Sequence, residues 1–365
     1  MKDVKDYYRD LHKIPEVSCM EYKTSEYLIN ELKRIGYEPQ RIGQTGLYTD
    51  LISDKNSSYI ILRADMDALS ITENTDLEWK SQNKGVMHAC GHDGHMAMLL
   101  SAAEKLYGKK LFHNIRFVFQ HAEENTMGAM EMIERGVIPE NTAAAFGLHN
   151  WPGVEENLIS TKIGALMASS DTYRVIVNGK SAHCGQQHLG SNALKTVVDI
   201  AHKLSELQDM AEDKRTILFC GSINSGKSHN VVPNYGELYG TLRSFSKSDR
   251  VLLKTKLEEI SKEIARKYGT EAELIWESGC PAIDNSASLI EKLKEIEPNL
   301  KTDEAPTLAA EDFACFQEKV KGVMLWLGTG NTPPLHNDKY YFPEKVLEKG
   351  VSLWGKIAEH NFNNN

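Results

Sequence analysis

The chain has 365 residues, of which 41% are hydrophobic and 25% are charged, as expected for a soluble globular protein with one large or two ordinary domains. Its net charge of −9, without a block of Lys or Arg, argues against nucleic acids and anionic membranes as partners. No apolar stretch approaches a membrane span, the charged first residues do not resemble a signal peptide, and the six cysteines lack CxxC spacing. These features predict reduced thiols and a cytoplasmic location.

Two helices are expected at the amino end, at residues 4–13 and 22–35, because Pro15 stops the first and Gly36 closes the second. Three apolar strands follow, and each leads into carboxylates or a histidine. The strands and their polar ends are residues 58–63 before Asp65 and Asp67, residues 115–120 before Glu123 and Glu124, and residues 143–148 before His149. Since these strands alternate with helices, we expect a mostly parallel sheet with helices on both faces.

In open α/β sheets, sites form beyond the carboxyl ends of the strands, so these polar ends are predicted to converge. Asp65 and Asp67 are two residues apart and would project to one face of an extended chain. Any single acid here could be a helix cap, but three such strand ends favour a functional site.

Residues 85–98 concentrate the side chains that bind borderline transition metals. The candidate ligands in this segment are His88, Cys90, His92, Asp93 and His95. The apolar run Met96–Leu106 predicts a helix, with Asp93 as its N-cap, so the ligands are expected on a tight loop at a helix start. The alternative is a His-rich surface loop with a buried structural cysteine.

From Asp171 onward the pattern changes to strand, helix, strand, strand, helix, strand, which is the order of a ferredoxin-like α+β unit of about a hundred residues. The expected elements are residues 171–178, 192–207, 216–223, 237–243, 249–268 and 273–276. We therefore expect residues 171–282 to form an inserted domain, and residues 1–170 and 283–365 to form a discontinuous first domain. Its last part should contain helices at 288–296 and 311–319, a strand at 323–327, and a helix from Glu344.

Gly221–Ser228 matches the P-loop pattern GxxxxGK[ST] and follows an apolar strand. A P-loop also needs a helix that starts at its Lys-Ser pair, because the amide groups of that helix bind phosphate. Here the next residues are β-branched and are broken by Pro233, so a nucleotide-binding module is the disfavoured reading.

Several motifs, taken together and in order, resemble one family. They are Arg63–Leu69, Met87–His95, Phe119–Glu124, Gly147–His149, Gly179–His183, Asn230–Pro233, Gly240–Arg243 and Ala310–Phe313. This series is similar to that of the two-metal amidohydrolases, which include aminoacylases, hippurate hydrolase, N-acetyldiaminopimelate deacetylase and plant auxin-conjugate hydrolases. The likeness spans nearly the whole chain, from Leu11 to His336.

The resemblance implies a catalytic domain interrupted by a lid and dimerisation domain, and hence a homodimer. It also implies two divalent ions (zinc, manganese, nickel or cobalt) held by Cys90, His92, Glu124, His149 and His336. Glu123 would be the general base, Asp65 and Asp67 would orient a ligand, and His183 would bind the oxyanion, reaching across the dimer.

The chemistry of these residue types agrees with such roles. Of two adjacent glutamates after a strand, one can bind a metal while the other carries protons. Metal coordination lowers the pKa of water to about 7. Asn230 and Arg243 are then candidates to bind a substrate carboxylate, although a lone arginine such as Arg243 is as often a solvated surface residue.

Two departures from the family pattern lie near the predicted pocket: His121 stands where proline is usual, and Cys184–His188 replaces a run of small residues and proline. They leave the metal ligands in place and bear on substrate choice. The leading prediction is a metal-dependent amidohydrolase that cleaves small N-acyl amino acids. The alternative on the same scaffold is a dipeptidase or aminopeptidase.

Overall fold

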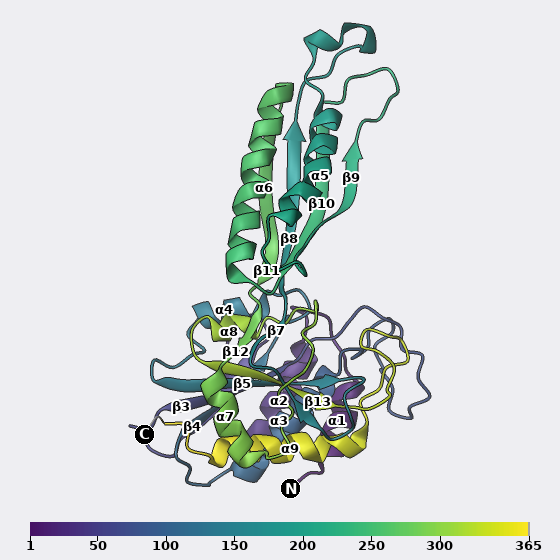
Figure 1. Ribbon diagram of the computed structural model, residues 1–365. Coiled ribbons are helices and arrows are strands. Elements are labelled where there is room, and N and C mark those ends of the chain that lie inside the picture. The colour runs from purple at the N-terminus through teal and green to yellow at the C-terminus, as the bar shows by residue number, and fades with distance from the viewer. Residues whose placement is uncertain (364–365) are drawn as a thin grey trace. The chain divides into compact units, whose positions relative to one another are not determined.

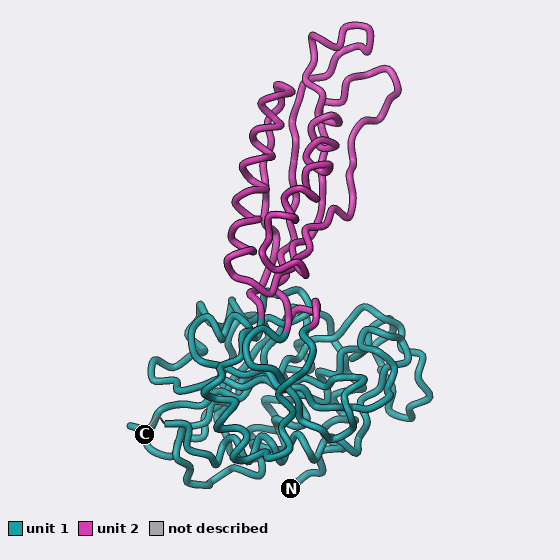
Figure 2. Tube along the Cα trace, viewed as in Figure 1, with its two compact units in different colours: residues 1–166, 283–306, 311–365 teal, residues 167–282, 307–310 magenta. Residues whose placement is uncertain are grey.

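The computed structural model describes residues 1–363, which form two compact units. The first unit comprises Met1–Leu166, Ile283–Pro306 and Glu311–Asn365, and the second comprises Met167–Ala282 and Thr307–Ala310 (Figure 2).

The first unit is organised around a central sheet (Figure 1). Its elements are α1 (Val4–His12), α2 (Tyr22–Ile35), β1 (Gln40–Arg41), β2 (Leu47–Leu51), β3 (Tyr59–Asp65), α3 (His92–Leu106), β4 (Asn114–Gln120), α4 (Gly128–Glu134), β5 (Thr142–Trp151), β6 (Ile159–Ser160), β7 (Gly164–Met167), β12 (Ile283–Asn285), α7 (Ala287–Ile296), α8 (Ala314–Gln317), β13 (Gly322–Gly328) and α9 (Glu344–Glu359). Within residues 1–363, the sheet has the strand order β1-β2-β4-β3-β5-β13-β6.

The four inner strands β4, β3, β5 and β13 run parallel, whereas β2 and β6 pair antiparallel to them. Helix α3 packs on β3 and contacts α1 and α9 on one face of the sheet, while α4 and α8 lie on the other face (Figure 1). Every residue of β4 and β13 is buried, as expected for parallel strands that are covered on both faces of the sheet. The predicted mostly parallel sheet with helices on both faces is confirmed.

Two local predictions are wrong, and one strand has no counterpart among the predicted elements. Strand β2 was not expected, because Thr49 and Asp50 interrupt its apolar pattern; in the fold, Asp50 forms a paired hydrogen bond with Arg116 on β4, at 2.7 and 2.8 Å. The helix predicted over residues 311–319 is only the short α8. Asp93 is not the N-cap of α3: Gly91, at φ 89° in the left-handed region, precedes a helix that begins at His92.

The second unit is a four-stranded antiparallel sheet with two long helices, in the strand order β11-β8-β10-β9. Its elements are β8 (Ser169–Asn178), η1 (Cys184–Leu189), α5 (Ala193–Asp209), β9 (Ile217–Ser225), β10 (Tyr235–Ser244), α6 (Lys247–Tyr268) and β11 (Glu271–Cys280). This is the predicted ferredoxin-like order. Lys227 and Ser228 lie in the loop between β9 and β10, not at the start of a helix, which removes the structural context that a P-loop needs.

Among residues 1–363, no helix combines the length and the apolar character needed to cross a membrane.

A buried ion network ties α1 to the start of α3. His12, at the end of α1, is 1% exposed, and its Nδ1 lies 2.5 Å from Asp93 Oδ2 while its Nε2 lies 3.2 Å from Glu73 Oε1. Burial opposes the charged form of His12, but its hydrogen bonds to Asp93 and Glu73 outweigh this and raise its pKa from 6.5 to about 9. The network therefore stabilises the fold when His12 is protonated.

We expect this stabilisation to depend on pH in a defined window. Because the folded-state pKa of His12 is raised, its contribution should be complete below about pH 6.5 and be lost as the pH rises through 9. The test compares the free energy of unfolding of wild type and His12→Gln at several pH values. The difference should shrink by about 3 kcal/mol between pH 6 and pH 10; a pH-independent difference would show that His12 is not charged in the fold.

Candidate metal centre

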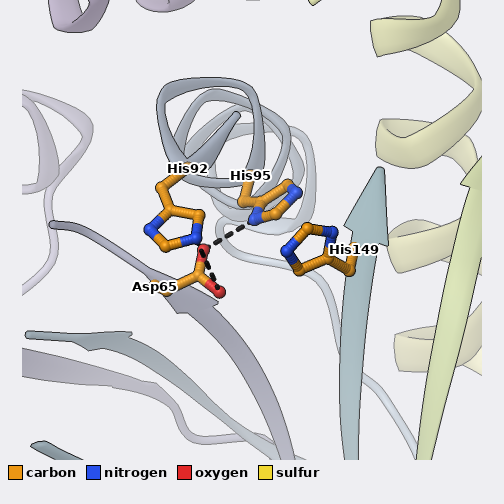
Figure 3. A group of neighbouring side chains, drawn as sticks. All are labelled: Asp65, His92, His95 and His149. Carbon is orange, nitrogen blue, oxygen red and sulfur yellow. Dashed lines mark hydrogen bonds and ion pairs between the residues drawn. The ribbon is translucent and has the colours of Figure 1, made fainter. Parts of the chain in front are cut away.

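The carboxyl edge of the parallel strands gathers the predicted site residues of the first unit. They come from the end of β3 (Asp65, Asp67), the start of α3 (Cys90, His92), the turn after β4 (Glu123, Glu124), the end of β5 (His149) and the loop before α9 (His336). Figure 3 shows His92 and His95 on α3 above Asp65, with His149 on the neighbouring strand. The ligand atoms of Cys90, Glu124 and His336 lie within 4.8 Å of one another, as do those of His92, Glu123 and Glu124.

His92 presents one ring nitrogen to this cluster. Its Nδ1 lies 2.8 Å from the carbonyl oxygen of Asp67, which can only accept, so Nδ1 carries a proton and Nε2 is the nitrogen that faces the cluster. Nε2 is buried without a hydrogen-bond partner in the described residues, 3.9 Å from Glu124 Oε1 and 4.0 Å from Glu123 Oε2. Burial lowers the pKa of His92, but Asp65, Asp67 and Glu124 outweigh it and raise it to about 10. The carboxylates around His92 therefore favour a positive charge at this position.

His149 is oriented by the same principle. Its Nδ1 donates to the carbonyl oxygen of Asn150 at 2.7 Å, which leaves Nε2 facing the Cys90 sulfur at 3.5 Å. Burial and the neighbouring His95 hold the pKa of His149 well below its usual range, so the ring is neutral, as a metal-binding imidazole must be.

Cys90, Glu124 and His336 form the second part of the cluster. His336 Nε2 lies 3.6 Å from Glu124 Oε1, and the His336 backbone N–H donates to Ala89 at 2.8 Å, which anchors its loop beside Cys90. Burial, Glu124 and Glu123 raise the pKa of the Cys90 thiol, so only a cation held there would favour the thiolate. Glu124 Oε1, like the free nitrogen of His92, is buried without a hydrogen-bond partner among residues 1–363.

Sulfur, imidazole nitrogen and carboxylate oxygen are the ligands of zinc and similar divalent metals. The two partnerless buried atoms, His92 Nε2 and Glu124 Oε1, both face this set, and such atoms are costly unless they bind something. The residues present therefore fit a divalent metal centre.

His95 is near the same atoms but is engaged elsewhere. Its Nδ1 lies 2.6 Å from Asp65 Oδ1 (Figure 3), and its Nε2 lies 2.5 Å from Asn150 Oδ1 and 3.0 Å from the backbone nitrogen of Asn150. With both nitrogens engaged, His95 is better suited to hold Asp65 than to bind a metal. Asp67 instead accepts the backbone N–H of Glu124, at 3.0 Å, and so fixes the turn after β4.

An arginine and two acids that are distant in the sequence complete the site. Arg63 is 2% exposed and lies 2.7 Å from Asp65, 3.0 Å from Glu311 and 2.9 Å from Asp312. The two acids also lie near Glu123, with ligand atoms within 4.8 Å of one another. Burial, then Glu311 and Glu124, raise the pKa of Glu123 well above its usual range, which suits a group that takes up protons. The motifs Arg63–Leu69 and Ala310–Phe313 contain these residues, but nothing in the local sequence links one motif to the other.

The predicted residues of the second unit lie at its two ends. His183 is exposed and its Nδ1 accepts the backbone N–H of Gly185 at 3.1 Å; Asn230 is close by, because its carbonyl oxygen accepts the N–H of Cys184 at 2.9 Å. Arg243 is half-buried near the other end of β10, where it pairs with Ser170. Arg243 is eight residue steps along β10 from Tyr235, which lies at the end near His183, a distance of about 26 Å at the usual rise per residue. One copy of this unit therefore does not bring Asn230 and Arg243 together.

Comparison with known proteins agrees with this geometry. The model described as Peptidase family M20/M25/M40 matches residues 61–360. An N-acetylcysteine deacetylase of Bacillus subtilis is 31% identical over 364 residues, covering 96% of this chain and 94% of the relative. Thermostable carboxypeptidase 1 of Saccharolobus solfataricus is 34% identical over 366 residues, covering 96% and 93%. A solved Bacillus subtilis structure, described as a dinuclear metal binding peptidase of the M20 family, has a TM-score of 0.83 at 30% identity and covers 97% of this chain and 96% of its own. The resemblance drawn from the motifs is confirmed.

We expect the adjacent glutamates to divide into a proton carrier and a metal ligand. Glu123→Gln keeps the size of the side chain but cannot accept a proton, so turnover should fall by about 100-fold or more while metal content stays unchanged. Glu124→Gln should lose or loosen one ion, because a neutral amide oxygen is a poorer ligand than a carboxylate. Metal stoichiometry after dialysis and turnover under matched metal supply measure both effects.

The matched control is Glu155→Gln, which changes an exposed glutamate in another loop of the same unit and should keep both properties. Metal loss in Glu123→Gln together with full metal content in Glu124→Gln would reverse the two roles. Full activity in both variants would remove this acidic pair from the catalytic centre.

Proposed function

The chain belongs to peptidase family M20/M25/M40, and we propose that it is a metal-dependent amidohydrolase that removes the acyl group from small N-acyl amino acids. The observation that carries the proposal is the cluster in which His92 Nε2 and Glu124 Oε1 are buried without hydrogen-bond partners among the described residues, beside a glutamate with a raised pKa. The deacetylase relative supports the N-acyl substrate class, and the solved relative supports a dinuclear centre.

The proposed ligands of two divalent ions are Cys90, His92, Glu124, His149 and His336. When bound, the ions would polarise the scissile carbonyl and lower the pKa of water toward 7. Zinc, manganese, nickel and cobalt all accept this mixture of sulfur, nitrogen and oxygen ligands.

The side chains around the proposed ions would transfer protons and hold the reacting groups in position. Glu123 takes a proton from the attacking water and later gives it to the leaving amine. Its raised pKa, caused by burial and by Glu311, favours proton uptake. Asp65 holds His95, which in turn contacts Asn150, and Asp67 fixes His92 and the turn of Glu124, so the reacting groups keep their places.

We further propose that the active enzyme is a homodimer in which the second unit acts as a lid. His183 and Asn230 lie at one end of that unit and Arg243 lies toward the other, so one substrate can meet both ends only if a second copy supplies one of them. Strand β9 is at the edge of its sheet and carries Phe219, which is 58% exposed. Helix α5 exposes Val198, at 47%. An open edge with apolar side chains supports pairing with another copy of the chain.

A cytoplasmic location is part of the same proposal, supported by the scattered cysteines of the sequence.

The proposed function is tested by metal analysis of the purified protein and a panel of substrates. We expect two divalent ions per chain and faster hydrolysis of N-acetyl and N-benzoyl amino acids than of unblocked dipeptides. Faster cleavage of the unblocked dipeptides would favour the peptidase alternative, whose support is the carboxypeptidase relative. Protein without divalent ions and without amidase activity would refute the proposal.

A mixing experiment tests whether His183 acts across a dimer. His183→Ala should lower kcat by about 100-fold without changing metal content, because it removes a donor to the oxyanion. Glu123→Gln is inactive for a different reason, so a mixed dimer of the two variants would have one site with both groups intact. Refolded or co-expressed equal mixtures should regain about a quarter of the wild-type activity, since half of the random dimers are mixed. No regain would place His183 in the site of its own chain or outside the reaction.

A further inference from the structure

The turn that carries Glu123 and Glu124 has a strained backbone. Ala122, immediately before the pair, has φ 53°, and Thr126 just after it has φ 58°, both in the left-handed region that side chains other than glycine rarely adopt. The turn closes on itself, because the Ala122 carbonyl accepts the N–H groups of Met127 and Gly128 at 3.3 and 3.1 Å. A side chain at Gly128 would overlap the carbonyl oxygen of His121. Such a conformation persists only when its surroundings hold it.

A carboxylate from a distant part of the sequence holds this turn. Glu21 Oε1 accepts the backbone N–H of Ala122 at 2.8 Å, across 101 residues of sequence, and Glu21 Oε2 accepts the hydroxyl of Thr45 at 2.5 Å. Glu21 is 0% exposed. Although it stands at the N-cap position of α2, its side chain makes no capping hydrogen bond to that helix. The carboxylate therefore serves the turn after β4 and the Thr45 loop rather than its own helix.

The same segment also supports the other side of the turn. Ser18 donates its hydroxyl to Asp67 Oδ2 at 2.7 Å, and that oxygen accepts the backbone N–H of Glu124 at 3.0 Å. The backbone amides on both sides of Glu123, those of Ala122 and Glu124, are thus held by carboxylates that lie on or are bonded to residues 18–21. The orientation of the Glu123 and Glu124 side chains therefore depends on these two hydrogen bonds.

Burying a carboxylate costs free energy of desolvation, which hydrogen bonds must offset. An apolar side chain of similar size would fill the same space without this cost. A helix-capping role would explain such a residue, but the capping bond is not made. Glu21 instead accepts the backbone N–H of Ala122 and so fixes the orientation of that amide in the strained turn.

We propose that Glu21 is a positioning residue that sets the direction of Glu123 and Glu124 through the backbone of Ala122. The proposal rests on the proposed function, because it assigns a purpose to the turn that carries the general base and a metal ligand. The hydrogen bonds of the Glu21 carboxylate go to Ala122 and Thr45 and not to a proposed metal ligand, so it acts through the backbone N–H that it accepts.

The test removes the acceptor and leaves the ligands untouched. Glu21→Leu should weaken Zn²⁺ binding at one of the two sites by about tenfold or more and lower kcat by a similar factor, since the partners that orient metal ligands have effects of this size. KM should change less than kcat. Glu21→Asp, which keeps the charge but is too short to reach the amide, should act in the same direction and serves if the leucine variant does not fold.

Two further variants separate positioning from simple stability. Glu21→Gln retains an oxygen that can accept the Ala122 N–H, so it should restore near wild-type Zn²⁺ affinity and turnover. Glu16→Leu is the matched control, because Glu16 accepts the N–H groups of Lys23 and Thr24 at 2.8 and 2.9 Å and supports α2 without contacting the turn. It should lower the Tm while both ions and turnover are retained.

Unchanged Zn²⁺ affinity in Glu21→Leu and Glu21→Asp would overturn the proposal. So would equal losses of metal in Glu21→Leu and Glu16→Leu, because destabilisation alone would then explain them. The metal titration does not depend on the substrate: wild-type protein that binds Zn²⁺ but leaves N-acyl amino acids intact would refute the proposed substrate class, and the comparison of Glu21 variants would still decide the role of Glu21.

Discussion

The concentration of negative charge at the carboxyl ends of β3 and β4 is the constraint on which the rest of the structure depends. Asp65, Asp67 and Glu123 are buried at 6% exposure or less, and Glu124 is close beside them. Buried carboxylates at such distances must be neutralised by cations, protons or hydrogen-bond donors. Arg63 supplies part of this compensation, and the unpaired atoms His92 Nε2 and Glu124 Oε1 leave room among the described residues for a cation to supply the rest.

The backbone, more than other side chains, decides what each ligand presents to the centre. His92 and His149 each donate one ring N–H to a main-chain carbonyl, which fixes the tautomer of both rings and turns the other nitrogen toward the cluster. Main-chain carbonyls at the ends of β3 and β5 move only if the sheet moves. The orientation of both rings is therefore a property of the parallel sheet.

Much of this site could be predicted from local sequence. The strand ends and the Cys/His loop revealed the residues near the centre, because metal-binding side chains at strand ends are rare without a purpose. Prediction failed where a residue's partner is distant. Arg63 meets Asp312 across 249 residues, and no local pattern links them. Asp93 appeared to be a helix cap because the sequence does not reveal that His12, 81 residues earlier, takes its carboxylate. The division of labour between Glu123 and Glu124, and the role of the second unit, stay predictions.

The position of β13 in the sheet means that the sheet cannot be completed until late in synthesis on the ribosome. Strand β5 is complete at Trp151. Its hydrogen-bonding partner β13 begins only at Gly322, after residues 167–282 of the second unit have been made. During that interval the edge of β5 is an open template for strand pairing, and the centre still lacks His336. Nascent chains of this protein should therefore be substrates for chaperones that cover exposed strands, and the cluster of Cys90, Glu124 and His336 can form only near the end of synthesis.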